Sequence, residues 1–327
     1  MRYLPKSSRW RRRSNERFCW RQGGGELVSV RKAKLEAHAK INLGLKICGR
    51  RADGYHEIST IYQEIDLADE LEFEVEPSPG PVRLEVEGAD LPTDETNLVL
   101  RAAAELARRR PGGSWRTRVR LVKRVPVGGG LGGGSSDAAA TLLALDALWD
   151  LHLSRAEMWT IARGIGADVP FFLTGGTALA SGIGDVLEPV CQWEDPVGVL
   201  VVPEVQVSTR WAYSQVKIGL TKRRGCGKFR SFLRLRPRLA EWGRWLENDF
   251  EAVVLRAYPE IGELMRLLEQ GGAEFARMSG SGACLFGLFS VPEQAVRAAE
   301  KVGSRARVVQ FRFVRGSSQG PEATDVG

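Results

Sequence analysis

The chain is predicted to be an α+β protein of two domains, and three observations support this. Strand and helix patterns are clustered along the sequence rather than strictly alternating, which favours α+β over a doubly wound sheet. With 327 residues, 43% of them hydrophobic, the chain is long enough for two separate cores. Its composition shifts after residue 190, so we expect domains at 34–190 and 191–315, flanked by a disordered basic extension (1–33) and a polar tail (316–327).

The first predicted domain begins with apolar residues that alternate along the chain, which indicates a strand. A later segment has an acidic start and a basic end, as a helix favours, and another has Ser154 and Glu157 spaced as a capping box. The expected elements are a strand at 34–47, β-rich sequence through 58–62, a hairpin around the Pro/Gly turn of 69–90, a helix at 94–109, a strand at 116–125, a glycine loop with its helix, and a helix at 154–166.

The second predicted domain opens with a continuous apolar run, which is typical of a buried strand. A basic insert and a helical pattern that breaks at Pro259 follow it. The expected elements are a strand at 197–205, a solvated insert at 217–238, helices within 248–272, a strand pair within 275–290, a helix at 292–303 and a strand at 305–314.

The net charge of +7 belongs to the N-terminal extension and not to the body of the protein. Residues 1–33 hold ten Lys/Arg and two Asp/Glu, which leaves 37 basic and 38 acidic groups in the rest. The core is therefore not expected to bind nucleic acid, whereas the extension could contact RNA or an anionic lipid, or act as a transit peptide. The apolar runs are too short to span a bilayer. Five scattered cysteines without a CxxC pair indicate a reducing cytoplasm.

The glycine-rich loop is the most informative motif in the chain. Six glycines lie within residues 128–134, and Ser135, Ser136 and Asp137 follow before an Ala/Leu-rich run of helical character. Glycine lets backbone N–H groups approach a ligand closely, and a helix N-terminus attracts anions. A Walker A loop would need Lys-Ser or Lys-Thr after the last glycine, and a dinucleotide fingerprint would need a later acidic residue. We therefore predict a phosphate-binding loop of another kind, in preference to a flexible linker.

Phosphoryl transfer needs a phosphate cradle, a positive charge and a base for the acceptor hydroxyl. Lys40 is a candidate cation within an apolar strand, although its position opposite the apolar set also fits a solvent-facing residue. Asp168 is a candidate base on a turn before Pro170, where an Asp also serves as a cap or turn former. A second small-residue loop, SGSG at 279–282, fits either an anion-binding concavity or a plain turn.

Three sequence blocks resemble, in order and spacing, the three motifs of the GHMP kinase superfamily. They are AKINLGLKICGRRADGYHEI at 39–58, PVGGGLGGGSSDAAATLLAL at 126–145 and MSGSGACLFGLF at 278–289. The resemblance covers about residues 34–315 and implies a ribosomal-protein-S5-like N-terminal domain that binds ATP and a ferredoxin-like α+β C-terminal domain. ADGYH (52–56) and GADVPFF (166–172) resemble the member that acts on a cytidine-diphosphate-linked sugar alcohol.

Roles for individual residues follow from this resemblance. It implies that Lys40 and Asp168 are catalytic, with Asp168 as the base. It implies that two aromatic rings stack on the cytosine and that an imidazole hydrogen-bonds to it. The implied substrate-binding residues are Asn42, Tyr55, His56 and Tyr213. The implied ATP-binding residues are Asn97, Pro126, Val127, Gly128, Gly129, Gly130, Leu131, Gly132, Gly133, Gly134, Ser135 and Ser136.

The implied reaction is ATP-dependent phosphorylation of the 2-hydroxyl of a cytidyl methylerythritol in the non-mevalonate isoprenoid pathway. Mg²⁺ is expected to bridge the ATP phosphates, and the sequence names no protein ligand for it. We expect a small-molecule substrate, no membrane partner, and a cytoplasmic monomer or weak homodimer. Two alternatives stay open: a GHMP kinase for homoserine, mevalonate or a sugar, and a non-catalytic sensor or RNA-binding protein of the same fold.

Overall fold

The computed structural model describes residues 18–20, 28–216 and 227–315, which form two compact units. Unit 1 consists of described residues from segments 1–39, 67–125 and 133–173. Unit 2 consists of described residues from segments 40–66, 126–132 and 174–327. Along the chain, runs of strands are followed by runs of helices, and the two kinds of element do not alternate strictly. The predicted α+β class is therefore confirmed. The units interleave in sequence, and the predicted domain boundaries remain a prediction.

Two long strands contribute residues to both units. They are β2 (Val28–Arg50) and β3 (His56–Pro79), and the strand order of their sheet is β1-β2-β3-β5-β4. In unit 1, β3 pairs antiparallel with β5 (Trp115–Val122), and β5 pairs parallel with β4 (Val82–Glu87). The predicted hairpin over 69–90 is therefore wrong. Its Pro/Gly turn reverses the chain, but β5 is inserted between the two strands that the turn connects.

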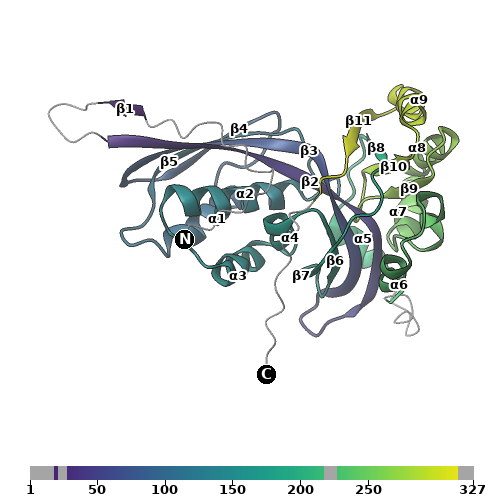
Figure 1. Ribbon diagram of the computed structural model, residues 1–327, viewed down its shortest axis with the longest axis horizontal. Coiled ribbons are helices and arrows are strands. Elements are labelled where there is room, and N and C mark those ends of the chain that lie inside the picture. Colours follow the sequence, from purple (N-terminus) through teal and green to yellow (C-terminus); the bar gives the residue numbers. More distant parts are fainter. Residues whose placement is uncertain (1–17, 21–27, 217–226, 316–327) are drawn as a thin grey trace. The chain divides into compact units, whose positions relative to one another are not determined.

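Helices cover one face of the unit 1 strands (Figure 1). They are α1 (Leu98–Ala107), α2 (Gly133–Leu148), α3 (Arg155–Ile165) and α4 (Val169–Thr174). α1 starts later than predicted because Asn97 is its N-cap, with Oδ1 accepting a hydrogen bond from the Val99 N–H. The capping box that Ser154 and Glu157 predict at the start of α3 is confirmed.

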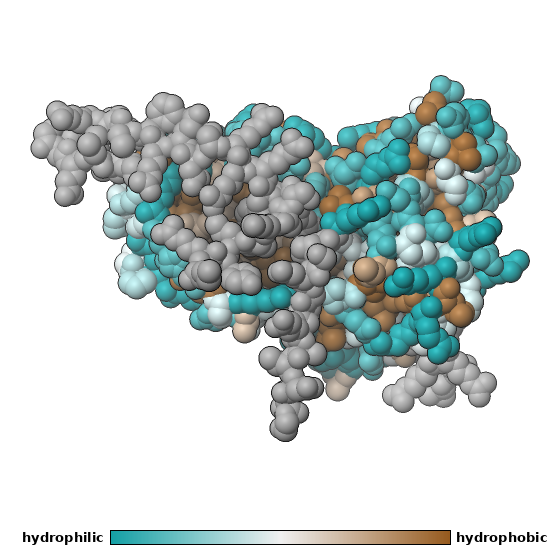
Figure 2. Space-filling model, in the orientation of Figure 1, coloured by the Kyte–Doolittle hydropathy of each residue, from teal (hydrophilic) through white to brown (hydrophobic). Residues whose placement is uncertain are grey.

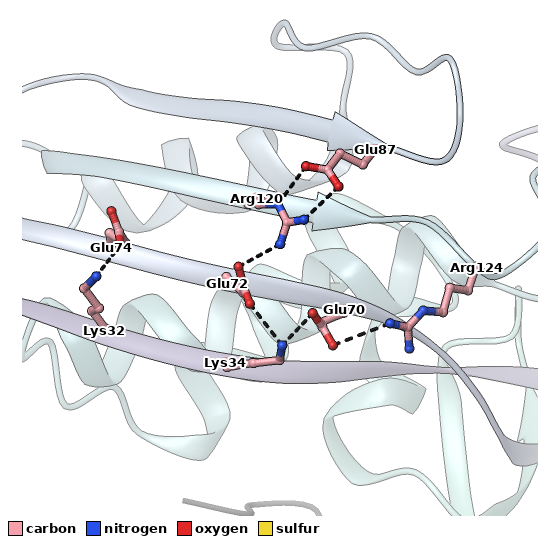
Figure 3. A network of polar contacts seen from close by, with 8 residues as sticks. All are labelled: Lys32, Lys34, Glu70, Glu72, Glu74, Glu87, Arg120 and Arg124. Atoms are coloured by element: carbon pink, nitrogen blue, oxygen red, sulfur yellow. Dashed lines mark hydrogen bonds and ion pairs between the residues drawn. The ribbon is translucent and has the colours of Figure 1, made fainter. Parts of the chain in front are cut away.

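The opposite face of the unit 1 strands carries a self-neutralising network of charges (Figure 3). Lys34 Nζ on β2 donates to Glu70 at 2.6 Å and to Glu72 at 3.0 Å. Arg120 on β5 extends the network from Glu72 to Glu87 of β4. Exposed ion pairs of this kind contribute little to stability, because solvent screens the charges. The basic groups labelled in Figure 3 are thus each paired with an acidic group on this face.

Unit 2 contains a second, antiparallel sheet of order β11-β8-β10-β9. Its strands are β8 (Val197–Val202), β9 (Phe275–Met278), β10 (Leu285–Phe289) and β11 (Arg307–Arg312). The predicted break at Pro259 is confirmed, because α7 (Glu251–Ala257) ends before it and α8 (Pro259–Gln270) starts with it. α9 (Pro292–Gly303) has the predicted bounds, and β6 (Thr177–Ser181) joins β3 to β7 (Val186–Val190). Figure 2 shows hydrophilic and hydrophobic residues interspersed over α6 to α9.

Several predictions from composition need correction. The basic insert at 217–238 is not simply a solvated loop, because its described part contains α6 (Lys228–Leu235), whose Phe229 and Phe232 are both 0% exposed. The extension is shorter than predicted, because 28–33 belong to β2 and β1 (Phe18–Trp20) pairs with that strand. The rest of the extension, residues 217–226 of the insert and the tail 316–327 lie outside the described residues.

The remaining elements of unit 2 are α5 (Thr209–Gln215) and a short 3₁₀ helix, η2 (Leu239–Arg244). Among the described residues, no helix is both long and apolar enough to cross a membrane. Cys191 and Cys284 are free thiols, whereas Cys48 is disulfide-bonded, which the cysteine spacing did not predict. Disulfides are unusual in a reducing compartment, so the cytoplasmic location remains a prediction.

Candidate active site

Lys40 lies in the buried part of β2 and is 4% exposed, so the solvent-facing interpretation of this residue is wrong. Its ammonium donates to Asn42 Oδ1 at 2.7 Å and to the Gly130 carbonyl at 2.8 Å, and it lies 5.2 Å from the centre of the Tyr62 ring. Asn42 in turn donates from Nδ2 to Thr60 Oγ1 at 2.8 Å. Lys40 and Asn42, which the sequence assigned to catalysis and to substrate binding, are thus hydrogen-bonded to each other within unit 2.

The glycine loop of unit 2, residues 126–132, is attached to β2 by its backbone. The Lys40 N–H donates to the Leu131 carbonyl at 2.9 Å, beside the side-chain bond from Lys40 to Gly130. Gly130 cannot be replaced without strain, because its φ is +76° and a Cβ there would lie 2.2 Å from the Ser279 carbonyl oxygen. The loop is therefore a defined structure, and the linker interpretation does not describe it.

The SGSG loop contacts the glycine loop directly within unit 2. Ser279 is fully buried, and its Oγ donates to the Gly130 carbonyl at 3.0 Å. The same Oγ accepts a hydrogen bond from the Asn42 backbone N–H at 3.3 Å. The structure therefore brings together Lys40, Asn42, Gly130 and Ser279, three sequence motifs in one network.

In unit 1, a buried ion cluster lies beside the start of α2, and sequence reasoning missed two of its three members. Lys123 Nζ donates to Asp137 at 2.8 Å and also to Asp69. Asp69 Oδ1 accepts the backbone N–H groups of Arg124 at 2.6 Å and Val125 at 2.8 Å, so it fixes the chain just before the glycine loop. The sequence did contain one indication of this cluster. Lys123 follows the every-second-residue pattern of the buried residues of β5, and that pattern points its charged side chain inward.

Burial dominates the electrostatics of this cluster. It raises the pKa of the Asp137 carboxyl to about 7, although the Lys123 charge opposes the shift. Burial also disfavours the Lys123 ammonium, but the charges of Asp137 and Asp69 outweigh it, so the pKa of Lys123 is raised. Asp137 Oδ1 has no hydrogen-bond partner among the described residues.

Asp168 ends the turn before α4, as predicted, and its carbonyl accepts the Phe171 N–H at 3.2 Å. It belongs to unit 1 and Lys40 to unit 2, so their convergence remains a prediction. Asn97 also belongs to unit 1, where capping α1 occupies its Oδ1 and its Nδ2 donates to the Pro92 carbonyl at 2.8 Å.

The residues expected to bind cytosine lie in unit 2. His56 stacks directly on Tyr213 with ring centres 4.7 Å apart, and Tyr213 meets Phe250 edge-on at 4.8 Å. Partial burial and the charge of Arg50 lower the pKa of His56, which keeps its imidazole neutral at pH 7. Tyr55 is 62% exposed. A ring separation of 4.7 Å leaves no room for a base between His56 and Tyr213.

Comparisons with known proteins agree with this arrangement. Sequence models of the GHMP kinase N-terminal domain and of the GHMP kinase C-terminal region match residues 97–176 and 230–307. The 4-diphosphocytidyl-2-C-methyl-D-erythritol kinase of Chlorobaculum tepidum is 41% identical over 290 residues, which cover 84% of this chain and 95% of the relative. The enzyme of the same name from Pelotomaculum thermopropionicum is 43% identical, with 81% and 92% covered.

Solved structures give the same result. A crystal structure of 4-(cytidine 5'-diphospho)-2C-methyl-D-erythritol kinase superposes with a TM-score of 0.71 at 34% identity, covering 86% of this chain and 99% of that one. A homoserine kinase from Cytophaga hutchinsonii also reaches 0.71, but at 18% identity it shows the fold alone. The fold and the three clustered motifs are those of a GHMP kinase. Within that superfamily, the chain belongs to the 4-diphosphocytidyl-2-C-methyl-D-erythritol kinases.

Proposed function

We propose that this enzyme transfers the γ-phosphoryl group of ATP to the 2-hydroxyl of 4-diphosphocytidyl-2-C-methyl-D-erythritol, a step of the non-mevalonate isoprenoid pathway. The observation that carries the proposal is 41% identity, over 84% of the chain, to a kinase of that name. The hydroxyl oxygen forms a bond to the γ-phosphorus as the bond from that phosphorus to the β-γ bridging oxygen breaks. ADP leaves with the bond electrons.

Lys40 and Asp168 are the proposed catalytic residues. Asp168 accepts the proton of the attacking hydroxyl, and Lys40 stabilises the ionised oxygen or keeps Asp168 ionised. Asn42, which is hydrogen-bonded to Lys40, is proposed to contact the acceptor. The neutral His56 offers a donor and an acceptor to the edge of a cytosine. His56 covers one face of the Tyr213 ring. For the cytosine to stack on that face, the His56 ring has to move away, and Tyr55 then covers the opposite face of the base.

The glycine loop and the start of α2 are the proposed site for the ATP phosphates, with Asn97 near the adenine and ribose. Backbone N–H groups of the loop and the positive end of the α2 dipole are the attracting groups. These residues are Asn97, Pro126, Val127, Gly128, Gly129, Gly130, Leu131, Gly132, Gly133, Gly134, Ser135 and Ser136.

Mg²⁺ enters this proposal only as an ion carried by the nucleotide. The described residues contain no group of three or more His, Cys, Asp and Glu side chains that could hold a metal. Asp137 Oδ1 is a buried oxygen without a partner in the described chain, but the carboxylate is paired with the Lys123 ammonium, which disfavours a cation beside it. These residues do not fit a protein-held Mg²⁺ site, and no protein ligand is assigned. ATP supplies phosphate oxygens, and Mg²⁺ keeps several waters.

A coupled assay of ADP release tests the proposed substrate. We expect turnover with 4-diphosphocytidyl-2-C-methyl-D-erythritol and only background rates with mevalonate and homoserine in parallel reactions. Turnover of either control in place of the cytidyl substrate would assign the enzyme to another GHMP kinase activity. We further propose a cytoplasmic enzyme that is a monomer or weak homodimer; cell fractionation and sedimentation test these two points.

A further inference from the structure

Asn248 is a buried amide in unit 2 to which the proposed mechanism gives no role. It is 5% exposed and lies in a short segment held against β2. The Leu45 N–H donates to the Glu247 carbonyl at 2.8 Å, and the Asp249 N–H donates to the Leu45 carbonyl at 2.9 Å. These two backbone bonds fix the main chain on both sides of Asn248.

The side chain of Asn248 uses both of its N–H donors and its oxygen on backbone groups. Nδ2 donates to the carbonyls of Met278 and Gly280, each at 2.8 Å, and Oδ1 accepts the Phe250 N–H at 3.0 Å. The two carbonyls flank Ser279. The amide therefore holds the SGSG loop on either side of the serine.

Ser279 passes this constraint to the glycine loop. Its hydroxyl donates to the Gly130 carbonyl at 3.0 Å, and Lys40 Nζ donates to the same carbonyl at 2.8 Å. Hydrogen bonds of 3.0 Å or less thus connect Asn248 to Gly130 through Ser279. Asn248 holds the carbonyls on either side of Ser279, and the Ser279 hydroxyl holds Gly130. The Gly130 peptide lies in the segment proposed to present N–H groups to the ATP phosphates.

We propose that Asn248 is a positioning residue for ATP: by clamping the SGSG loop, it sets the Gly130 peptide in the orientation that binds the nucleotide phosphates. This inference deepens the proposed function and rests on ATP as the phosphoryl donor. Asparagine is required because both Asn248 donors face carbonyl oxygens. An aspartate of the same shape would place a carboxylate oxygen against them.

Asn248→Asp is the test, with steady-state KM values for both substrates and calorimetric Kd values for ATP and ADP. We expect the KM and Kd for ATP to rise about tenfold, while the KM for the cytidyl substrate stays within about twofold. A merely structural role would lower the melting temperature without separating the two substrates. If Asn248→Asp does not fold, Asn248→Ala removes the same donors without adding charge and carries the same expectation.

Gln63→Glu is the matched control in the same unit. Gln63 is 1% exposed, its Nε2 donates to the carbonyls of Glu64 at 2.8 Å and Val314 at 3.3 Å, and its Oε1 accepts from Thr177 at 2.6 Å. It is thus another buried amide that holds two carbonyls, and neither carbonyl belongs to the glycine loop or to the SGSG loop. Gln63→Glu should lower stability and leave the KM for ATP unchanged.

Ser279→Ala tests the route through the serine. If Asn248 acts through Ser279, the double variant should raise the KM for ATP no more than the worse single variant. An ATP KM and Kd within twofold of wild type in a folded Asn248 variant or in Ser279→Ala overturns the proposal, as does an equal rise in Gln63→Glu. Absence of wild-type turnover on the cytidyl substrate would instead contradict the proposed function, and the nucleotide Kd values would still decide the role of Asn248.

Discussion

Lys40 shows how a charged side chain is retained inside a strand. Residues 40–45 of β2 are all buried, so both faces of the strand are covered there, and alternation no longer separates a core side from a solvent side. The ammonium is accommodated because Asn42 Oδ1 and the Gly130 carbonyl accept its hydrogen bonds. A buried charge that is partnered in this way is costly to remove, since its acceptors lose their donor.

Asp168→Asn and Lys40→Ala test the proposed catalytic pair. Each should lower kcat by at least ~10²-fold, the size expected for loss of a general base or of a charge at the reacting group. Lys40→Ala should also lower the free energy of unfolding by about 1–3 kcal/mol, because buried acceptors lose a donor. Steady-state kinetics and urea denaturation measure the two effects. Near-full activity of Asp168→Asn would exclude it as the base, and its ATP affinity serves as the control.

Tyr55→Ala should raise the KM for the cytidyl substrate about 5- to 150-fold, the equivalent of about 1–3 kcal/mol of base stacking. Because Tyr55 is 62% exposed, its removal should leave the melting temperature nearly unchanged. The KM for ATP is the internal control. An unchanged KM for the cytidyl substrate would contradict the stacking role.

Asp137→Asn tests the buried ion cluster by its pH dependence. Burial raises the pKa of Asp137 from 3.8 to about 7, so the folded state keeps a proton that the unfolded state loses. This contribution to stability is fully present below pH 3.8 and is lost as the pH rises to about 7. We therefore expect the wild type to lose stability, relative to Asp137→Asn, between pH 5 and about 7.5 in urea denaturation. Parallel profiles would contradict this, and Asp90→Asn, at an exposed carboxylate, is the control.

Among the elements, α6 was the least visible in the sequence. Its segment, KFRSFLRL, is strongly basic, and only two aromatic residues, Phe229 and Phe232, spaced three places apart, indicate an inward face. Phe229 packs so closely on β2 that a Cβ on Gly44 would lie 2.8 Å from its ring. The basic composition correctly indicated that one side of this helix faces solvent. The burial of its other side could not be predicted, because it depends on contacts with residues that are distant in sequence, such as Gly44.

Phe229→Ala should lower the free energy of unfolding by about 3–5 kcal/mol, as expected for emptying a buried aromatic site. Leu235→Ala on the same helix should change it by less than about 0.5 kcal/mol, because Leu235 is 57% exposed. Denaturant unfolding of the two variants measures the difference. Equal effects would mean that α6 is not part of the unit 2 core.

Local patterns predicted elements well where periodicity and caps agreed. The strand of β8, the helix of α9 and the capping box of α3 all followed from neighbouring residues. Pairing between strands was not predictable in the same way: the turn after β3 gave no sign that β5 would lie between β3 and β4. At the site, motifs identified Lys40 and Gly130, but Asp69 and Asn248 act through backbone groups of other segments, which no local pattern reveals.

For the whole molecule, the charge distribution leads to a prediction about nucleic acid. Residues 1–17 hold seven Lys/Arg and one Glu, so deleting them leaves a net charge of +1. Any affinity for RNA or heparin at low salt should be lost in this deletion variant, while kcat/KM for the kinase reaction stays within about twofold. Filter binding and the ADP-release assay measure the two properties. RNA binding that survives the deletion would place it on the folded units, and full-length protein at high salt is the control.

The interleaving of the units has a consequence for synthesis on the ribosome. The Arg312 N–H donates to Asp66 across 246 residues, and Ile65 forms a bridge with Phe313. The contacts of this end of β3 therefore cannot be completed until the last strand has been translated. At about 5–20 residues per second, that delay is roughly 12–50 seconds. During this interval the nascent chain holds Ile58, Ile61 and Ile65, which are buried in the finished fold, before all of their neighbours have been translated. Exposed apolar side chains of this kind favour aggregation during synthesis.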